Sequence, residues 1–205
     1  MMFFRKKRVW NTLDDVITGT REMLHHGARA FNHPWHWPAL GTLGDTGVCQ
    51  RTVILRSYEE SDRTLICHSD LRAEKISQIR NDARVGFLFY DSKEKIQLRV
   101  SGTATVHTDD PISDVHWKRT PLVGRMNYCT TEPPGAPLER PESGLPEFVT
   151  KKAAKLADSQ TGRENFAAIC CRFDRMDWLK LGLTGHRRAR FLWGEDRLDA
   201  FWVVP

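Results

Sequence analysis

The feature that most constrains the fold is a succession of short apolar runs, separated by turn residues, that fills most of the chain after residue 37. Residues 85–91 (VGFLFYD) and 96–108 (IQLRVSGTATVHT) carry the β-branched and aromatic residues that favour strands. Gly102, inside the second run, predicts a bulge or a bend. Similar runs lie at 63–68, 165–173, 176–182, 186–193 and 199–205. We expect about eight or nine strands, without the strand–helix alternation of doubly wound folds.

A β-hairpin is predicted around the turn Gly44-Asp45-Thr46-Gly47, with the segment RTVILR, residues 51–56, in its second arm. Because side chains alternate between the two faces of a strand, Arg51 and Arg56 are expected to point to opposite sides. Two surface charges with their stems over the barrel edge would be the ordinary explanation.

Helices are predicted at the periphery of these strands. Residues 11–30 have apolar side chains at helical spacing, with Asn11 or Thr12 as N-cap. Ser69 or Asp70 is expected to cap a short helix over 73–80, and Asp109 or Asp110 before Pro111 starts another that ends near Thr120. A further helix is expected over 147–160, and the five prolines of 130–146 predict a loop of functional length or a flap.

The predicted fold is therefore mainly β with peripheral helices: an antiparallel barrel formed by residues 37–205, on which residues 1–36 pack as a helical extension, in a single domain. Hydrophobic residues make up 40% of the chain and charged residues 28%, which is globular composition. No apolar run approaches the roughly 20 residues that a membrane helix needs, so we expect no membrane partner. The five cysteines are odd in number and scattered, and we expect reduced thiols in a cytoplasmic protein.

The sequence lacks several familiar catalytic and binding motifs. It contains no GxGxxG after a strand, no GxxxxGK[ST], no GxSxG and no HExxH. His25, His26, His33 and His36 cluster without cysteines or paired carboxylates at ligand spacing, so no metal site is predicted. The net charge of +5 suits an anionic partner without identifying it.

Basic and polar residues at strand ends and a helix start remain as candidates. They are Arg51 and Arg56, His68 and Ser69, Lys75, Gln97, and the series His186, Arg187, Arg188 and Arg190. Each alone is explained by a solvated face, but their order and spacing resemble the FMN-binding split barrel of the pyridoxamine 5'-phosphate oxidase family. The resemblance covers roughly residues 37–205 and includes NDARVGFLF, the spacing of Gln97 and Gly102, and the pair Arg190-Phe191.

This resemblance implies FMN as the cofactor. Arg51 and Lys75, with the Ser69 hydroxyl and a helix N-terminus near Asp70, would converge on its dianionic phosphate. Gln97 would meet the mixed polar edge of the flavin ring. By analogy the contacts also include Arg190, Arg56, His68 and the backbone of Thr52, Val53, Ile54 and Leu55.

The resemblance also implies a homodimer with FMN at the subunit interface, because a small barrel is filled by side chains and a second subunit would supply the missing wall. Trp178, Trp193 and Trp202 are candidates for that interface, although core packing is the commoner role.

On the substrate side the sequence departs from the vitamin-B6 enzyme. Arg56 replaces a Lys, His116 and Thr120 stand where a Tyr and an Arg are expected, and the family's Arg-x-His reads His186-Arg187-Arg188. We expect an FMN-dependent oxidoreductase for a small anionic or electron-rich molecule, not an efficient pyridoxamine phosphate oxidase. No catalytic residue is assigned. A flavin-binding sensor or carrier is the first alternative, and a basic β-barrel that binds nucleic acid through HRRAR and RKKR is the second, although we expect no nucleic-acid partner.

Overall fold

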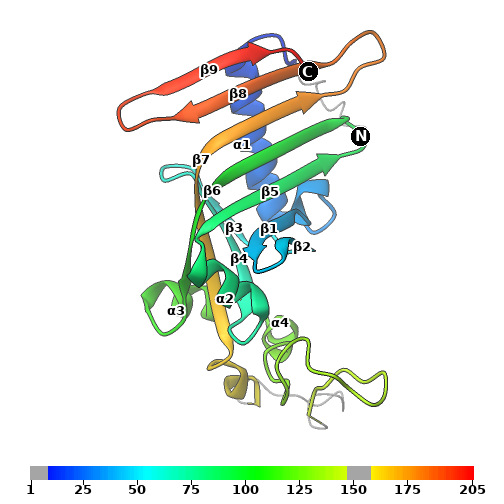
Figure 1. The fold of residues 1–205 in the computed structure, drawn as a ribbon, viewed down its shortest axis with the longest axis vertical. Coiled ribbons are helices and arrows are strands. Elements are labelled where there is room, and N and C mark those ends of the chain that lie inside the picture. Colours follow the sequence, from blue (N-terminus) through cyan, green and yellow to red (C-terminus); the bar gives the residue numbers. More distant parts are fainter. Residues whose placement is uncertain (1–8, 147–157) are drawn as a thin grey trace, which may run out of the picture.

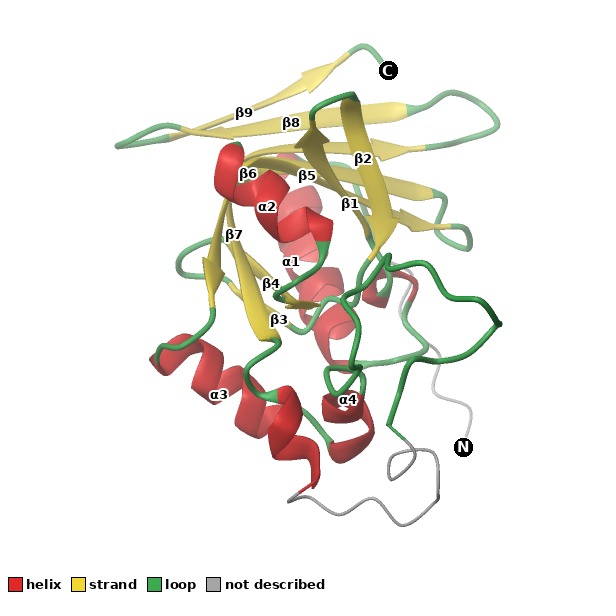
Figure 2. Ribbon diagram, turned by 60° about the horizontal axis from the view of Figure 1, so that its bottom comes forward, coloured by secondary structure: helices red, strands yellow, loops and turns green. Residues whose placement is uncertain are grey.

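The structure is a computed structural model in which residues 9–146 and 158–205 are described. Its strands are β1 Ala39–Gly44, β2 Gly47–Thr52, β3 Ser57–Glu59, β4 Thr64–Asp70, β5 Arg84–Asp91, β6 Ile96–His107, β7 Phe166–Lys180, β8 Arg187–Trp193 and β9 Leu198–Val203. The helices are α1 Leu13–Arg29, α2 Glu74–Asn81, α3 Pro111–Arg119 and α4 Leu122–Met126, with 3-10 turns η1 Pro34–His36 and η2 Asp158–Gly162. The predicted antiparallel, mainly β architecture with peripheral helices is confirmed (Figure 2).

The sheet divides into two parts that share the long strands β6 and β7. The strand order is β2-β1-β5-β6-β7-β4-β3, and β8 and β9 branch from β7. One half of β7 pairs with β8, and the other half pairs with β4. Figure 1 shows the result as an upper sheet that includes β5, β6, β8 and β9, and a lower one that includes β3 and β4. Every pairing is antiparallel.

Gly102 marks the point where β6 bends from one part to the other. The register between β6 and β7 shifts at Ser101 and Gly102, which confirms the predicted bulge. A Cβ at Gly102 would overlap the Arg172 carbonyl group of β7, so only glycine allows the two backbones to approach this closely.

Helix α1 packs against the inner side of the barrel. Thr12 and Asp15 form a capping box at its start, which confirms one of the two predicted N-caps. Val16, Met23 and Leu24 are fully buried and belong to the same core cluster as the inward residues of the strands. The division into an extension and a barrel stays a prediction.

Three expectations about local structure are wrong. Residues 51–56 are not one strand: β2 ends at Thr52, and the next residues leave the hairpin because the N–H of Val53 and that of Leu55 bond to Pro38 and His36. Ser69 and Asp70 do not cap α2 but end β4; the N-cap is Ala73, without a side-chain hydrogen bond. The predicted strands 165–173 and 176–182 form the single strand β7, in which Asp174 alone has no partner on a neighbouring strand, opposite Ser101 and Gly102. Trp178 is fully buried in the core, which is the commoner of the two roles that the sequence allows.

The remaining predictions have mixed outcomes. The strand β5 and the helix that begins after Asp110 are confirmed, the latter by a capping box between Asp110 and Ser113. Short elements such as β3 and α4 were not predicted. Most of the helix expected over 147–160 lies outside the described residues. No helix in the described ranges is long and apolar enough to cross a membrane.

Candidate functional site

The first group of predicted residues meets where β2, β4 and α2 come together. Lys75, in the first turn of α2, points its Nζ to the Ser69 hydroxyl of β4 at 3.1 Å. Arg51 and Lys75 are close enough for their charges to repel, and this repulsion contributes to the lowering of the Lys75 pKa. Arg51, Ser69 and Lys75 are therefore brought together, as the sequence predicts for a phosphate site.

The guanidinium of Arg51 is held in place by neutral partners. Its Nη1 donates to the Thr42 hydroxyl at 2.5 Å and to the Cys49 carbonyl at 3.1 Å. Its Nη2 donates to Gln78 Oε1 at 3.1 Å, and Thr42 also donates to that oxygen. Thr42 and Gln78 were not predicted as site residues, since nothing in the sequence brings β1 and α2 together around Arg51. Their role is to fix the direction of the cation.

Charge in this group is not balanced within the described part of the chain. Burial and then the Arg51 cation lower the pKa of Lys75. No carboxylate in the described ranges lies in ion-pair distance of Arg51 or Lys75. Two fixed cations of this kind, with a hydroxyl beside them, form a site for a small dianion such as a phosphate group. The donor set thus fits the phosphate of FMN, which the sequence predicts.

The backbone after β2 offers fewer donors than the resemblance implies. The N–H groups of Val53, Leu55 and Arg56 already donate to Pro38, His36 and Ile66. Ile54 is the residue of this segment whose N–H has no acceptor among the described residues. Any backbone hydrogen bond from 53–56 to a ligand is therefore expected at Ile54.

A second group forms around His68, on the side of β4 that α3 covers. His68 Nε2 lies 3.1 Å from His116 Nδ1, and His68 Nδ1 is buried without a hydrogen-bond partner. Arg56 is close enough to affect the pKa of His68, and its Nε is also buried without a partner. Burial, His116 and Arg56 together lower the pKa of His68 to about 3, so this imidazole is neutral.

His116 is neutral for a related reason. Its pKa is lowered by burial first and by the Arg119 charge second. Two neutral imidazoles and one guanidinium therefore meet here, with two buried polar atoms still available to a ligand. Arg56 and His116 were both predicted on the substrate side, whereas His68 was predicted as a cofactor contact; the structure brings all three together.

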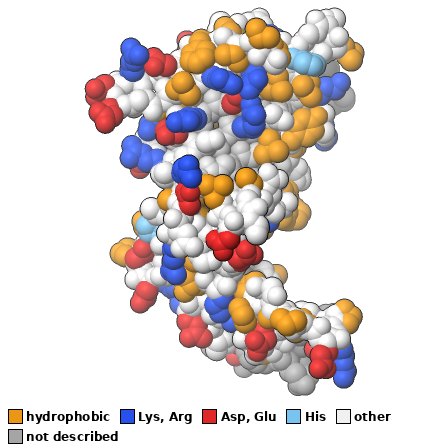
Figure 3. Space-filling view, in the orientation of Figure 1, with side chains coloured by type: hydrophobic (Ala, Val, Ile, Leu, Met, Phe, Trp, Pro, Cys, Tyr) orange, Lys and Arg blue, Asp and Glu red, His pale blue; other side chains and the backbone are white. Residues whose placement is uncertain are grey.

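A third group lies on the upper sheet, on the face opposite α1. Asp177 of β7 accepts hydrogen bonds from Arg99 Nη2 at 2.8 Å, from Arg188 at 2.8 and 2.9 Å, and from Arg190 at 3.2 Å. Burial raises the pKa of Asp177, but the hydrogen bond from Arg188 and the charge of Arg99 hold it below the usual value. Figure 3 shows basic side chains gathered with acidic ones among them on this face.

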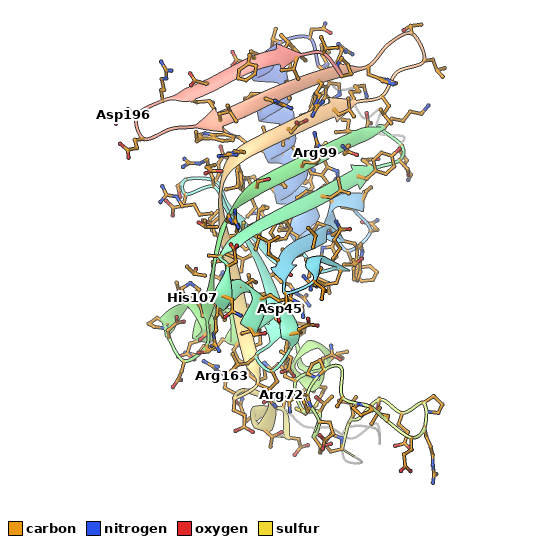
Figure 4. All side chains as sticks on the ribbon, viewed as in Figure 1. Asp45, Arg72, Arg99, His107, Arg163 and Asp196 are labelled. Atoms are coloured by element: carbon orange, nitrogen blue, oxygen red, sulfur yellow. The ribbon has the colours of Figure 1, made fainter. Side chains whose placement is uncertain are left out.

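The other predicted residues belong to this third group. Gln97 lies beside it, because Gln97 pairs with Leu179 and Leu179 with Arg188. His186 accepts a hydrogen bond from the Gly182 N–H at 3.2 Å. Arg99 and Asp177 were not predicted; their cross-strand pairing carries no local sequence signal. Figure 4 places Arg99 high on the upper sheet and Asp45, in the β1–β2 turn, much lower. In the strand order, β1 and β5 separate Arg51 on β2 from Gln97 on β6, and Arg190 lies two strands further, on β8.

A hollow of about 720 Å³ lies on the outward face of β1, β5 and β6. Gly41 and Gly86 are directly paired at its floor, and neither has a side chain to fill it. Val48 and Leu88 on its walls are 65% and 42% exposed. The hollow is a largely apolar surface next to the basic face of the upper sheet.

These features define a class of protein: a split barrel with a cationic group of side chains that fits a phosphate. Residues 20–108 match the family model of the pyridoxamine 5'-phosphate oxidase, FMN-binding domain. The match begins inside α1, earlier than the resemblance from the sequence suggested. Over these residues the chain is similar to the FMN-binding domain of this family, and the predicted resemblance is confirmed. A comparison with curated proteins found no match.

Solved structures share the whole fold. A pyridoxamine 5'-phosphate oxidase-related, FMN-binding protein from Nostoc punctiforme is 20% identical, covers 91% of this chain and 96% of its own, and superposes with a TM-score of 0.75. PhzG from Burkholderia lata, solved with tetrahydrophenazine-1-carboxylic acid, is 15% identical, covers 96% of this chain and 98% of its own, and gives a TM-score of 0.71. At these identities the similarity establishes the fold.

Proposed function

We propose that this protein binds FMN and acts as an FMN-dependent oxidoreductase on a small anionic or electron-rich molecule. The observation that supports the proposal most directly is the group of Arg51, Ser69 and Lys75, two oriented cations and a hydroxyl that lack a carboxylate among the described residues. A bound FMN would supply two-electron redox chemistry through its flavin ring.

In this proposal the residues of the chain bind and orient. Arg51 and Lys75 neutralise the phosphate, and Thr42 and Gln78 keep Arg51 directed at it. The Ile54 N–H is available to the cofactor. Gln97 and Arg190 would contact the flavin from a second copy of the chain, since they lie on strands away from Arg51 within one copy.

The substrate side is proposed to be the group of Arg56, His68 and His116. Arg56 provides one cation, and the two imidazoles beside it are neutral, so the group carries less positive charge than a phosphate dianion requires. A carboxylate is the better match, since a guanidinium binds it through two parallel hydrogen bonds. PhzG, which shares the fold, was solved with a carboxylic acid on an electron-rich ring, and we extend this chemical class to the present chain. Efficient oxidation of B6 phosphates is not expected.

The test is a titration of the apoprotein with FMN, followed by flavin absorbance and fluorescence. One FMN per chain is expected. Arg51→Ala and Lys75→Ala each remove a charged hydrogen bond worth about 1.5 to 3 kcal/mol, so FMN should bind roughly ten- to a hundredfold more weakly. Arg80→Ala is the matched control, because Arg80 lies on the same helix and is exposed; its affinity should equal that of the wild type.

Two outcomes would contradict the proposal in different ways. A wild-type protein that binds no FMN would reject the cofactor. Normal FMN affinity in both the Arg51 and Lys75 variants would leave FMN binding intact but reject the phosphate site. Once FMN is bound, reoxidation of the reduced flavin with and without carboxylated aromatic substrates separates an oxidoreductase from a carrier.

A further inference from the structure

Three side chains outside the sites described above form a continuous hydrogen-bonded chain where β6 runs into α3. The Thr105 hydroxyl lies 2.8 Å from His107 Nε2. On the other side of the same ring, His107 Nδ1 lies 2.7 Å from Asp110 Oδ2. The order is hydroxyl, imidazole, carboxylate, which is the arrangement that activates an alcohol in acyl-transfer enzymes.

The carboxylate of Asp110 is held firmly. Its second oxygen, Oδ1, accepts the Ser113 N–H of α3 at 2.8 Å. Arg163 reinforces this corner by donating to the Thr108 carbonyl at 2.9 Å and to the Ser113 hydroxyl at 3.0 Å. Asp110 is therefore fixed by the helix start, and His107 is fixed in turn by Asp110.

The hydrogen-bond chemistry sets the tautomer of His107. An ionised carboxylate only accepts hydrogen bonds, so His107 Nδ1 carries the proton that it shares with Asp110. In the neutral ring Nε2 then has a free lone pair, and this atom faces the Thr105 hydroxyl. The imidazole is thus oriented to take the hydroxyl proton, which is the role of the base in such a chain.

The hydroxyl is also accessible. Thr105 is exposed on β6, whereas the side chains of His107 and Asp110 are only 19% and 35% exposed. A small electrophile can therefore reach the nucleophile while its base and the carboxylate stay shielded. Thr103, two residues earlier on the same face of β6, is exposed as well but is not hydrogen-bonded to an imidazole in the described structure.

We propose that Thr105, His107 and Asp110 form a nucleophilic site that accepts an acyl or phosphoryl group from small activated esters. Thr105 Oγ1 bonds to the carbonyl carbon, the bond from that carbon to the leaving oxygen breaks, and His107 Nε2 passes the hydroxyl proton to the leaving group. Water then attacks the acyl-threonine, with His107 taking its proton and returning it to Thr105. The structure assigns a nucleophile and a base, so the expected substrates are those that already carry a good leaving group.

The test uses the full-length protein and diisopropyl fluorophosphate, whose phosphorus bonds to the nucleophile as fluoride leaves with a proton. Peptide mass spectrometry should find one adduct, on Thr105, and none on Thr103. Thr105→Ser should keep the labelling, and Thr105→Val should abolish it. His107→Gln should slow it by about a hundredfold or more, since general-base catalysis contributes at least that factor. Thr103→Val is the control and should label like the wild type.

Equal labelling of Thr103 and Thr105, or no labelling of Thr105, would overturn the proposal and leave the three residues as a structural corner. So would an unchanged labelling rate in a His107→Gln variant whose thermal unfolding matches the wild type. If that variant does not fold, the labelling of Thr105 relative to Thr103 in the wild-type chain still tests the proposal. The release of 4-nitrophenol from 4-nitrophenyl acetate, with the same variants, gives a second measurement. Neither assay depends on FMN binding. A protein that fails to bind FMN could therefore still be labelled at Thr105, and the two proposals can fail independently.

Discussion

The buried imidazole of His68 makes this protein sensitive to acid. Its pKa falls to about 3 in the folded chain, because burial, His116 and Arg56 all disfavour the charged ring. In the unfolded chain it titrates near its ordinary pKa of about 6.5. Between these two values the unfolded state binds a proton that the folded state does not, so the free energy of unfolding decreases as the pH falls below about 6.5. The slope from this one group is at most about 1.4 kcal/mol per pH unit.

Urea unfolding between pH 7.5 and 4.5 measures this effect. The wild type should lose stability steadily over the acid half of that range. His68→Phe should reduce the slope towards that of the remaining groups, because the new ring cannot titrate. In the wild type the His68 and Phe166 ring centroids are 4.8 Å apart, so a phenylalanine at position 68 would have an aromatic neighbour. His26→Gln, at an exposed position of α1, should leave the slope unchanged. Equal slopes in wild type and His68→Phe would show that His68 is not the buried neutral group.

At the scale of elements, the proline-rich segment 130–146 is attached to the barrel through Arg72. Its Nη1 donates to the carbonyls of Thr130 and Thr131 at 3.1 and 3.3 Å, and its Nη2 donates to the Thr130 hydroxyl at 2.9 Å. Asp70 fixes the same guanidinium from the other side at 2.8 Å. Arg72→Ala should therefore release the start of the segment, and the glutamate-specific endoproteinase Glu-C should cut after the exposed Glu142 several times faster.

Mass spectrometry of the early Glu-C fragments follows that cut. Arg84→Ala, which removes an exposed ion pair with Asp82, is the control and should leave the rate at Glu142 unchanged. Arg72→Lys should behave more like Arg72→Ala than like the wild type, since an ammonium group lacks the planar fork that reaches several acceptors. A cleavage rate unaffected by Arg72→Ala would mean that other contacts hold the segment.

The elements also show what the sequence reveals and what it does not. Local signals located α1 through its Thr12 cap, α3 through Asp110 and Pro111, and the bend of β6 through Gly102. The single strand β7 was missed, because residues 173–176 look like a turn, whereas Phe173, Arg175 and Met176 pair with β6 and only Asp174 is left out. Arg51 and Lys75 could be named as candidates from the sequence, because basic residues at a strand end and a helix start are a local signal. Thr42 and Asp177 could not, because their contacts with Arg51 and Arg99 come from other strands.

At the scale of the whole molecule, the predicted cofactor residues lie in two places that one chain does not join. Lys75 lies on α2 and Arg51 is bonded to Gln78 of the same helix, whereas Gln97 and Arg190 lie on the face of the upper sheet. The hollow over Gly41 and Gly86 borders that face and exposes Val48 and Leu88. A second copy of the chain seated on this surface would cover the apolar residues and complete the site, so we expect a homodimer in which dimerisation and FMN retention are linked.

Gly86→Arg tests this arrangement without disturbing the single chain. A Cβ at Gly86 would meet only the Val100 carbonyl oxygen, at an ordinary 3.8 Å, so each chain should still fold. The arginine would fill the hollow and place a charge in the proposed interface. We expect sedimentation to show a monomer that retains the thermal unfolding of a folded chain and binds FMN at least tenfold more weakly. Lys118→Glu, at an exposed position of α3 that does not line the hollow, should stay dimeric and keep FMN. A wild-type protein that sediments as an FMN-loaded monomer, or a Gly86→Arg dimer with normal FMN affinity, would exclude this face as the interface.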